Sequence, residues 1–329
     1  MSSARWTEKF LVLDAHNDSL ILRQGREDPM DLTGENLMYQ VDLPRLRKGG
    51  MDCLFCMVGD NDLHQSGILI DAAYEMCRMH ADDFQICRTA SEVRTAHAHG
   101  KIAIVLTIEG QRMFDEHLEH LRNCHRLGVR VASLTHGGGG RPELQYDASY
   151  FGYIPPRERE NLRRQSKGLT PFAREALAEM ARLRIPVDVA HINDAAFWEV
   201  MEHAECPVCY THGCCYALCP HSRGLTDEMM KALAQKDGVM GIAFYQRFIH
   251  QTDPSLDRLC DHFIHAIEVM GPDHVGVGSD FDGTEGLLCP IPEDVSQLGI
   301  LFEALVKRDV DEETLRKIAG DNFLRLLES

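Results

Sequence analysis

Short apolar runs recur along the chain, and segments with helical periodicity separate them. Most runs are dense in Val, Ile and Leu without alternating polar residues, which is typical of parallel strands buried on both faces. Eight such runs occur: Phe10–Leu13, Cys53–Val58, Ile102–Thr107, Arg130–Leu134, Ile185–Val189, Val208–Tyr210, Val239–Phe244 and His274–Gly278. Eight strand-then-helix units predict one α/β domain over residues 1–329, a single (β/α)8 barrel of the TIM type. An open doubly wound sheet is the alternative, which the count of eight disfavours.

Several of the intervening segments carry helix signals. Thr170 and Pro171 supply an N-cap and a first-position proline for a helix over residues 172–184. Two further helices are predicted at Thr226–Lys236 and Leu256–Met270, with stops at Gly238 and Gly271.

Two long stretches, near residues 59–100 and 141–169, are predicted to form loops that cover the mouth of the barrel, where specificity resides in such folds. Four glycines, Gly137–Gly140, precede the second stretch. Because glycines provide no side-chain contacts, the sequence leaves the effect of this loop on the pocket open.

Composition and charge exclude some classes of function. The 329 residues carry a formal net charge of −17, whereas a nucleic-acid-binding protein needs a basic surface to neutralise phosphates. The 44% hydrophobic residues suffice for a large core, and no run approaches the ~20 apolar residues of a membrane span. No signal sequence or lipid-anchor motif is recognisable. We therefore expect a cytoplasmic protein without nucleic-acid or membrane partners.

Twelve cysteines are spread irregularly along the chain, and in a cytoplasmic protein most are expected to be reduced core residues. The pair Cys206 and Cys209, followed by Cys214, Cys215 and Cys219, could indicate a structural zinc site. However, the first pair lies in a predicted strand, where residues three apart point to opposite faces. Buried thiols are the favoured interpretation.

Polar residues able to bind a metal stand directly after many of the apolar runs. In a barrel, the carboxyl ends of all strands meet at one rim, so these side chains are expected to converge. A charged or imidazole group at the end of a buried strand is costly unless it is paired or bound to a metal. The residues concerned are His16, Asp18, Glu109, His136, His191, His212 and Asp280.

The spacing of five of these residues predicts two cation sites. His16 and Asp18 are two residues apart and could bind one cation, while His191 and His212 end neighbouring strands and could bind a second. Glu109, between the two groups, has two oxygens and could bridge both ions. A mixed set of imidazoles and carboxylates suits zinc, with manganese, cobalt or nickel as alternatives. The other histidines, including His221, His262 and His274, are predicted to be surface or helix-face residues.

The motifs match a known pattern when taken together. They are Asp14-Ala15-His16-Asn17-Asp18, Ile108-Glu109-Gly110, Leu134-Thr135-His136, Asp188-Val189-Ala190-His191, Tyr210-Thr211-His212, Ser222-Arg223-Gly224-Leu225-Thr226-Asp227, Gly278-Ser279-Asp280-Phe281-Asp282-Gly283 and Gly320-Asp321-Asn322-Phe323-Leu324-Arg325. With these motifs the chain resembles the membrane (renal) dipeptidase family of the amidohydrolase superfamily over nearly its whole length. It departs from the family at Gly137–Gly140, where an asparagine-rich segment is common, and at Gly213–Cys215, where serines are common. Secretion and anchor segments like those of the extracellular relatives are not expected here, so the location of those relatives is not transferred to this chain.

The resemblance implies a barrel with two Zn2+ per chain. His16 and Asp18 would bind one ion, His191 and His212 the other, and Glu109 both. His136 corresponds to a histidine that contacts the substrate and polarises the tetrahedral intermediate. Asp280 corresponds to a carboxylate that meets the substrate amino group and carries a proton.

Two more positions are matched on the substrate side. Arg223 corresponds to the arginine that binds the terminal carboxylate of the dipeptide. Tyr245 corresponds to a tyrosine that helps to hold the same carboxylate, on a shorter local match.

The resulting hypothesis is a metallo-dipeptidase that cleaves the amide bond of dipeptides, including those with a C-terminal D-residue, by a hydroxide between two cations. The alternative is an amidohydrolase that acts on an N-acyl amino acid, a lactam or a lactone with the same site. A metal-retaining barrel without turnover is disfavoured, because His136, Arg223 and Asp280 are all present beside the ligands. The expected partner is a small-molecule substrate, and a homodimer is compatible with the sequence.

Overall fold

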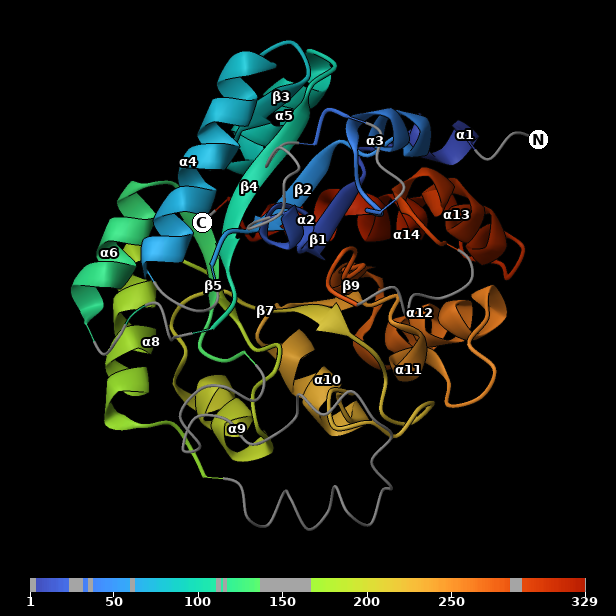
Figure 1. Cartoon of the computed structure of the whole chain (residues 1–329). Coiled ribbons are helices and arrows are strands. Elements are labelled where there is room, and N and C mark those ends of the chain that lie inside the picture. Colours follow the sequence, from blue (N-terminus) through green and yellow to red (C-terminus); the bar gives the residue numbers. More distant parts are fainter. Residues whose placement is uncertain are drawn as a thin grey trace.

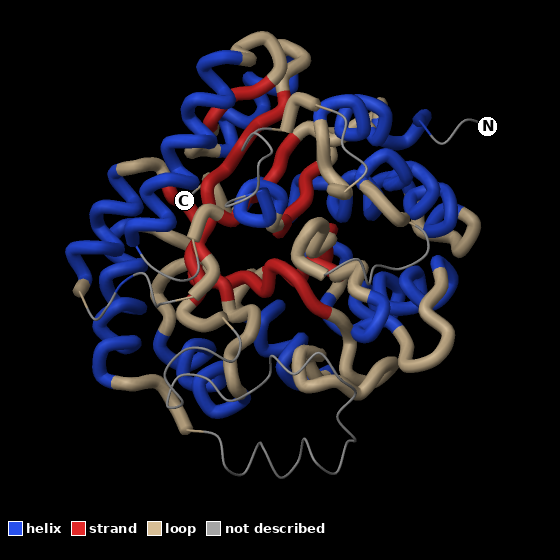
Figure 2. Tube along the Cα trace, in the orientation of Figure 1, coloured by secondary structure: helices blue, strands red, loops and turns tan. Residues whose placement is uncertain are grey.

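The computed structural model describes residues 4–23, 32–34, 38–59, 63–110, 114, 117–136, 167–284 and 292–328. Strands enclose the centre of the molecule and helices surround them (Figures 1 and 2). The strands are β1 (Leu13–Asn17), β2 (Cys53–Met57), β3 (Phe84–Ile86), β4 (Ile102–Ile108), β5 (Val129–Ser133), β6 (Val187–Asp188), β7 (Val208–Gly213), β8 (Val239–Ile242) and β9 (Val275–Val277).

The strands form one parallel sheet in the order β1-β2-β4-β5-β6-β7-β8-β9, with β3 paired to β4 outside this path. A parallel bridge between Asn17 and Phe281 brings the two ends of the path together. Each of the eight predicted apolar runs overlaps one strand of the path. The predicted (β/α)8 barrel is confirmed.

The first strand differs from its prediction. It begins at Leu13 and continues through His16 to Asn17, whereas the prediction ended it at Leu13, before the polar residues. Its register against β2 shifts between Asp14 and Asn17. Because Ser279 supplies hydrogen bonds to Asp14, polar residues can continue this buried strand.

The helices lie between the strands along the chain and outside them in space. The longer ones are α3 (Leu43–Gly49), α4 (Leu63–Met79), α5 (Ala90–Ala98), α6 (Leu118–Arg126), α8 (Pro171–Leu183), α9 (Asp194–His203), α10 (Asp227–Gln235), α12 (Leu256–Met270) and α13 (Leu298–Val306). Shorter ones are α1 (Ala4–Thr7), α2 (Ser19–Arg23), α11 (Gln246–Ile249), α14 (Glu312–Arg316) and α15 (Asn322–Arg325). Two 3₁₀ turns lie at Pro272–His274 and Val295–Gln297, and a π-helical turn lies at Lys317–Asp321. All three predicted helices are present as α8, α10 and α12. Thr170 caps α8 through the backbone N–H of Ala173.

The stretch near 59–100 is not a loop, so this prediction was wrong. Where described, it contains α4, β3 and α5, and β3 pairs with the first half of β4. Helix α4 buries Leu69, Ile70 and Met76, which explains why the segment packs against the barrel. The second predicted loop, 141–169, and Gly137–Gly140 lie outside the described residues except for 167–169.

The core has two parts. Between the sheet and the helices lies a large apolar cluster. A smaller cluster joins alternate strand residues, including Phe55 and Val105 on one side and Cys209 and Val239 on the other, with Phe323 from the C-terminal helix. In a barrel of this type the interior is packed with side chains, so a ligand can bind at the rim formed by the carboxyl ends of the strands. No helix among the described residues is long and apolar enough to cross a bilayer.

Candidate metal centre

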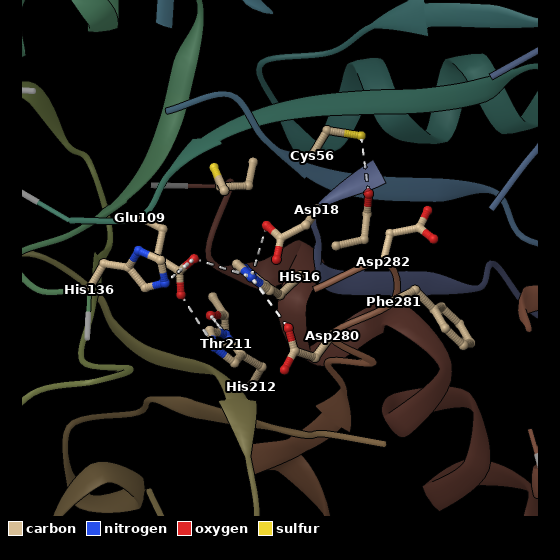
Figure 3. A network of polar contacts seen from close by, with 12 residues as sticks. His16, Asp18, Cys56, Glu109, His136, Thr211, His212, Asp280, Phe281 and Asp282 are labelled. Carbon is tan, nitrogen blue, oxygen red and sulfur yellow. Dashed lines mark hydrogen bonds and ion pairs between the residues drawn. The ribbon is translucent and has the colours of Figure 1, made fainter. Parts of the chain in front are cut away.

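The rim of the barrel collects the predicted side chains from six strands. His16 lies near the end of β1, Glu109 directly follows β4, and His212 lies in β7. Three others follow β5, β6 and β9 within a few residues: His136, His191 and Asp280. Figure 3 shows His16, Glu109, His136, His212 and Asp280 directed toward one another.

Glu109 is the centre of this cluster and is almost fully buried. One carboxylate oxygen, Oε1, lies 2.8 Å from Nε2 of His191 and 3.3 Å from Nε2 of His212. The other, Oε2, lies 3.6 Å from Nε2 of both His16 and His136. The two oxygens therefore face different imidazoles, as a carboxylate that contacts two ions must do.

The donor atoms form three overlapping groups, each within 4.8 Å. They are His16 with Asp18 and Glu109, Glu109 with His136 and His191, and His16 with His212 and Asp280. Nε2 of His16 lies 3.6 Å from Oδ1 of Asp18. The structure thus brings together all five residues that the sequence assigned to metal binding.

The protonation states favour cation binding. Burial lowers the pKa of His16 to about 4 and holds the pKa values of His191 and His212 well below the usual histidine range. Burial alone would raise the pKa of Glu109, but the facing imidazoles of His136, His16 and His191 hold it well below its usual range. Neutral imidazoles around an ionised carboxylate are what metal binding requires.

His191 and His212 both present Nε2 to the cluster, but their hydrogen bonds place the ring proton of His191 on that atom. The guanidinium of Arg223 can only donate, and its Nη1 lies 3.2 Å from Nδ1 of His191. Nδ1 of neutral His191 therefore accepts, and the ring proton lies on Nε2, which faces Glu109. Nε2 of His212 lies 3.2 Å from this Nε2 and accepts from it. A cation bound through Nε2 of neutral His191 would require the ring proton to lie on Nδ1, so the guanidinium of Arg223 would have to move away from that atom.

The residues present fit a divalent metal. Nε2 of His16 is buried and makes no hydrogen bond in the described part of the chain, which is costly for a neutral imidazole. Imidazole nitrogens and carboxylate oxygens are the donors of zinc and related ions. The groups identified among the described residues contain no cysteine.

Asp280 and Asp18 meet beside a glycine. The Asp280 carboxylate lies 3.9 Å from Nε2 of His16, and burial, reinforced by the charge of Glu109, raises its pKa to about 7. A Cβ at Gly283 would lie 2.1 Å from Oδ2 of Asp18 and 2.5 Å from Oδ1 of Asp280. Only a residue without a side chain fits here while both carboxylates keep their positions.

Arg223 is buried behind the histidines. Its Nη2 donates to the carbonyl oxygen of His212 at 3.1 Å, and its guanidinium lies 5.4 Å from the ring centroid of Phe248. Its Nε is buried without a hydrogen-bond partner in the described residues, so one donor remains for an anion. Tyr245 is also buried, and its ring packs edge-on against Phe248 at 4.7 Å. Both substrate-side residues therefore lie near one aromatic ring.

Sequence reasoning missed the residues that hold the ligand-bearing strand ends. Asp14 and Asp188 are buried carboxylates that accept hydrogen bonds from Ser279 and Thr211 respectively. Burial raises their pKa values to about 7 and about 6. Their position in the sequence could have revealed them, because each lies inside a strand-end motif two or three residues before a histidine that is predicted to bind a metal.

Three histidines outside the centre test the surface prediction. It was wrong for His221, which is buried and accepts a hydrogen bond from the backbone of Arg223. His262 lies on a helix, as one of the predicted alternatives had it, but it is fully buried. His262 accepts from the backbone N–H of Cys215 and faces the carbonyl of Ile249. Helix α12 thus uses an imidazole to satisfy backbone groups in the core. His274 is half-buried beside the carbonyl of Gly238.

The cysteines after β7 are separate buried thiols. Cys214, Cys215 and Cys219 each lie near a different backbone carbonyl, those of Ala243, His262 and Arg247. The described cysteines form no disulfide, and none of them belongs to a group of donor atoms identified among the described residues as able to hold a metal.

Comparison with known proteins gives concordant matches. A curated relative, dipeptidase aclJ of Aspergillus oryzae, is 32% identical, with 96% of this chain and 77% of the relative covered. Among solved structures, dipeptidase AC, a metallopeptidase of family M19, has a TM-score of 0.82 at 27% identity and covers 97% of this chain and 98% of its own. A metallopeptidase from Rhodobacter sphaeroides, liganded with a phosphinate mimic of the dipeptide L-Ala-D-Ala, has a TM-score of 0.81 at 27% identity, with 97% and 99% covered.

A family model covers almost the entire chain. The model of the membrane dipeptidase family, peptidase family M19, matches residues 2–329. This range includes every strand of the barrel and every residue of the rim cluster. The chain therefore belongs to the membrane dipeptidase family, peptidase family M19.

Proposed function

We propose that this protein hydrolyses the peptide bond of dipeptides with two Zn2+ per chain. His16 and Asp18 would bind one ion, His191 and His212 the other, and Glu109 both. The observation that carries the proposal is the position of Glu109, whose two oxygens face separate sets of imidazoles. Membership of a metallopeptidase family supports it.

Divalent ions at these residues would supply an ionised water at neutral pH and positive charge for the amide oxygen. The protein's own groups do the remaining work. His136 has a side chain 35% exposed at the rim, so it can reach a substrate and donate to the amide oxygen as that atom gains charge. A donor of this kind contributes about 3–4 kcal/mol to transition-state stabilisation.

Asp280 is the proposed proton carrier. Its carboxylate lies 3.9 Å from Nε2 of His16, beside the metal-binding residues, where it would accept a proton and donate it to the leaving amine. It is also proposed to meet the substrate ammonium. Arg223, with its buried Nε donor, and Tyr245 are proposed to bind the C-terminal carboxylate.

The substrate class follows from two charged contacts at opposite ends. A free ammonium and a free carboxylate within reach of Asp280 and Arg223 favour a dipeptide over longer peptides. The Rhodobacter relative binds a mimic of L-Ala-D-Ala, so we propose that a C-terminal D-residue is accepted here too.

Metal analysis combined with kinetics tests the proposal. Purified protein incubated with Zn2+ should retain close to two ions per chain and hydrolyse L-Ala-D-Ala. Glu109→Ala should lose both ions, because it contacts each, while Asp18→Ala as the matched control should lose one. A Glu109→Ala protein that retains two ions would exclude the bridging role. Faster turnover of N-acetyl-alanine than of dipeptides would favour the N-acyl alternative, since that substrate has no ammonium for Asp280.

A further inference from the structure

A buried carboxylate outside the metal-binding set ties the ends of β6 and β7 together. Oδ1 of Asp188 accepts hydrogen bonds from the backbone N–H groups of Ala190, at 2.9 Å, and Thr211, at 3.0 Å. Its Oδ2 accepts from the Thr211 hydroxyl at 2.5 Å. We call these three hydrogen bonds the Asp188 clasp. His191 and His212 directly follow the two residues that the clasp holds.

The same arrangement occurs between β1 and β9. Oδ1 of Asp14 accepts from the backbone N–H groups of His16, at 3.4 Å, and Ser279, at 2.7 Å, and Oδ2 accepts from the Ser279 hydroxyl at 2.6 Å. Asp280 directly follows Ser279. The same three hydrogen bonds therefore occur twice, each time next to site residues. This repetition indicates that the fold uses buried carboxylates to hold the strand ends that carry the site.

The Asp188 clasp extends to an imidazole, whereas the Asp14 clasp does not. The Thr211 oxygen lies 3.0 Å from Nδ1 of His212, and Figure 3 shows the two side chains together. Because the hydroxyl donates its only proton to Asp188, it can only accept from His212. Nδ1 of His212 then carries the ring proton, and Nε2 keeps its lone pair toward Glu109. The Ser279 oxygen instead accepts from the backbone N–H of Phe281.

We propose that Asp188 and Thr211 are positioning residues that fix the tautomer of His212 and so present its Nε2 to the proposed metal ion. This inference rests on the proposed function only for the identity of the ion. The tautomer itself is a property of the metal-free chain.

An amide at position 188 should reverse the hydrogen-bond chain. In Asp188→Asn, the two backbone N–H groups still require an acceptor at Oδ1, so the amide nitrogen must take the place of Oδ2. That nitrogen donates to Thr211, whose hydroxyl proton then turns to Nδ1 of His212. The ring proton moves to Nε2, the atom that should bind the ion.

The first measurement reads the tautomer directly. Metal-free protein labelled with 15N-histidine is compared at pH 8 by long-range 15N–1H spectra, with His212 assigned by the signal that His212→Gln removes. The parent should show the His212 proton on Nδ1, and Asp188→Asn should show it on Nε2. Asp14→Asn is the matched control, since it makes the same exchange in the other clasp and should leave His212 unchanged.

The second measurement is the affinity for zinc, determined by competition with increasing concentrations of a chelator. Asp188→Asn and Thr211→Val should each lower the affinity for one of the two zinc ions about 10- to 100-fold. This is the loss expected when a group that orients a metal ligand is removed. Thr211→Ser keeps the hydroxyl and should restore affinity to within a few-fold of the parent. This pair of Thr211 variants keeps the test valid if Asp188→Asn fails to fold.

An unchanged His212 tautomer in Asp188→Asn, or equal zinc affinity in Thr211→Val and Thr211→Ser, would overturn the inference. A parent protein that binds no zinc would instead contradict the proposed function, and the tautomer measurement would still decide the role of the clasp.

Discussion

Arg223 makes contacts that could serve either the substrate or the histidines. Its two terminal nitrogens contact His191 and the carbonyl of His212, while its buried Nε makes no hydrogen bond among the described residues. The family resemblance assigns it to the substrate carboxylate. Substitution alone cannot separate these roles, because loss of either set of contacts would slow turnover.

A crossed comparison of substrates separates them. Arg223→Met should lower kcat/KM for a free dipeptide by about 2–4 kcal/mol of transition-state binding, since a charge-assisted contact is lost. A dipeptide amidated at its C-terminus should be a poor substrate of the parent enzyme and nearly indifferent to this change. If both substrates slow equally in steady-state kinetics, Arg223 supports the histidines and the carboxylate assignment fails.

Backbone conformation is a second residue-scale feature of the centre. His191, Asp280 and Asp282 have φ values of 63°, 64° and 65°, in the left-handed region that costs on the order of 1–3 kcal/mol for residues with a side chain. Asp and His tolerate this region better than most residues. The strand ends therefore turn sharply at site residues, and the surrounding hydrogen bonds must hold that turn.

At the scale of elements, the turn after β4 depends on a glycine. Gly110 has φ 105°, and a Cβ there would lie 2.9 Å from the Cβ of His136. Gly110→Ala should destabilise the fold by ~1–2 kcal/mol and also displace His136, so kcat should fall at least 10-fold. Gly100→Ala is the matched control, with φ 69° and no atom within 4 Å of the added Cβ. In urea unfolding and kinetics, the control should lose stability alone. Full activity of Gly110→Ala would show that His136 does not need this packing.

Helix α12 carries a second element-scale prediction, through His262. Burial lowers the pKa of His262 to about 4, below the ordinary value of 6.5, so the unfolded chain binds a proton that the folded chain excludes. Stability should therefore fall as the pH decreases from about 6.5 to about 4. His262→Gln removes this titrating group. In the metal-free variant, the free energy of unfolding should therefore change less steeply with pH, by about 1.4 kcal/mol per pH unit. Urea unfolding at several pH values measures both slopes, and parallel curves would contradict the assignment.

The strands and helices also show which parts of the fold can be predicted from local sequence patterns. Dense apolar runs predicted the eight path strands, and capping residues predicted α8, α10 and α12, because both signals are local. Strand β3 was missed because it is only three residues long, and helices α4 and α5 were missed because they lie in the stretch near 59–100 that was predicted to be a loop. The extension of β1 through His16 was also missed, because its polar residues are satisfied by Ser279, far away in the sequence.

For the centre, strand-end position was enough to collect the metal-competent residues. It could not reveal the clasps, because Asp188 and Asp14 act through partners on neighbouring strands whose contacts exist only after folding. Nor could it show that Arg223 contacts two of the histidine residues. Sequence position locates a side chain at the rim, but the hydrogen-bond partner determines what its atoms can do.

At the scale of the whole molecule, the redox state of the cysteines is a separate prediction. The eleven cysteines among the described residues form no disulfide, and the proposed cytoplasmic location implies that all twelve in the chain are reduced. Denatured protein should therefore titrate close to twelve thiols without prior reduction. A count short by several would indicate disulfides and would contradict a reducing compartment. The location and a homodimer both stay predictions.

The contact between β1 and β9 has a consequence for how the protein is made. The hydrogen bonds from Ser279 to Asp14 join residues 265 positions apart, so His16 leaves the ribosome long before the strand that must lie beside it. Such distant pairing makes folding slow, because a long loop must close before its contacts can form. The sheet therefore cannot be completed, and the rim cluster cannot be assembled, until residue 280 has emerged from the ribosome.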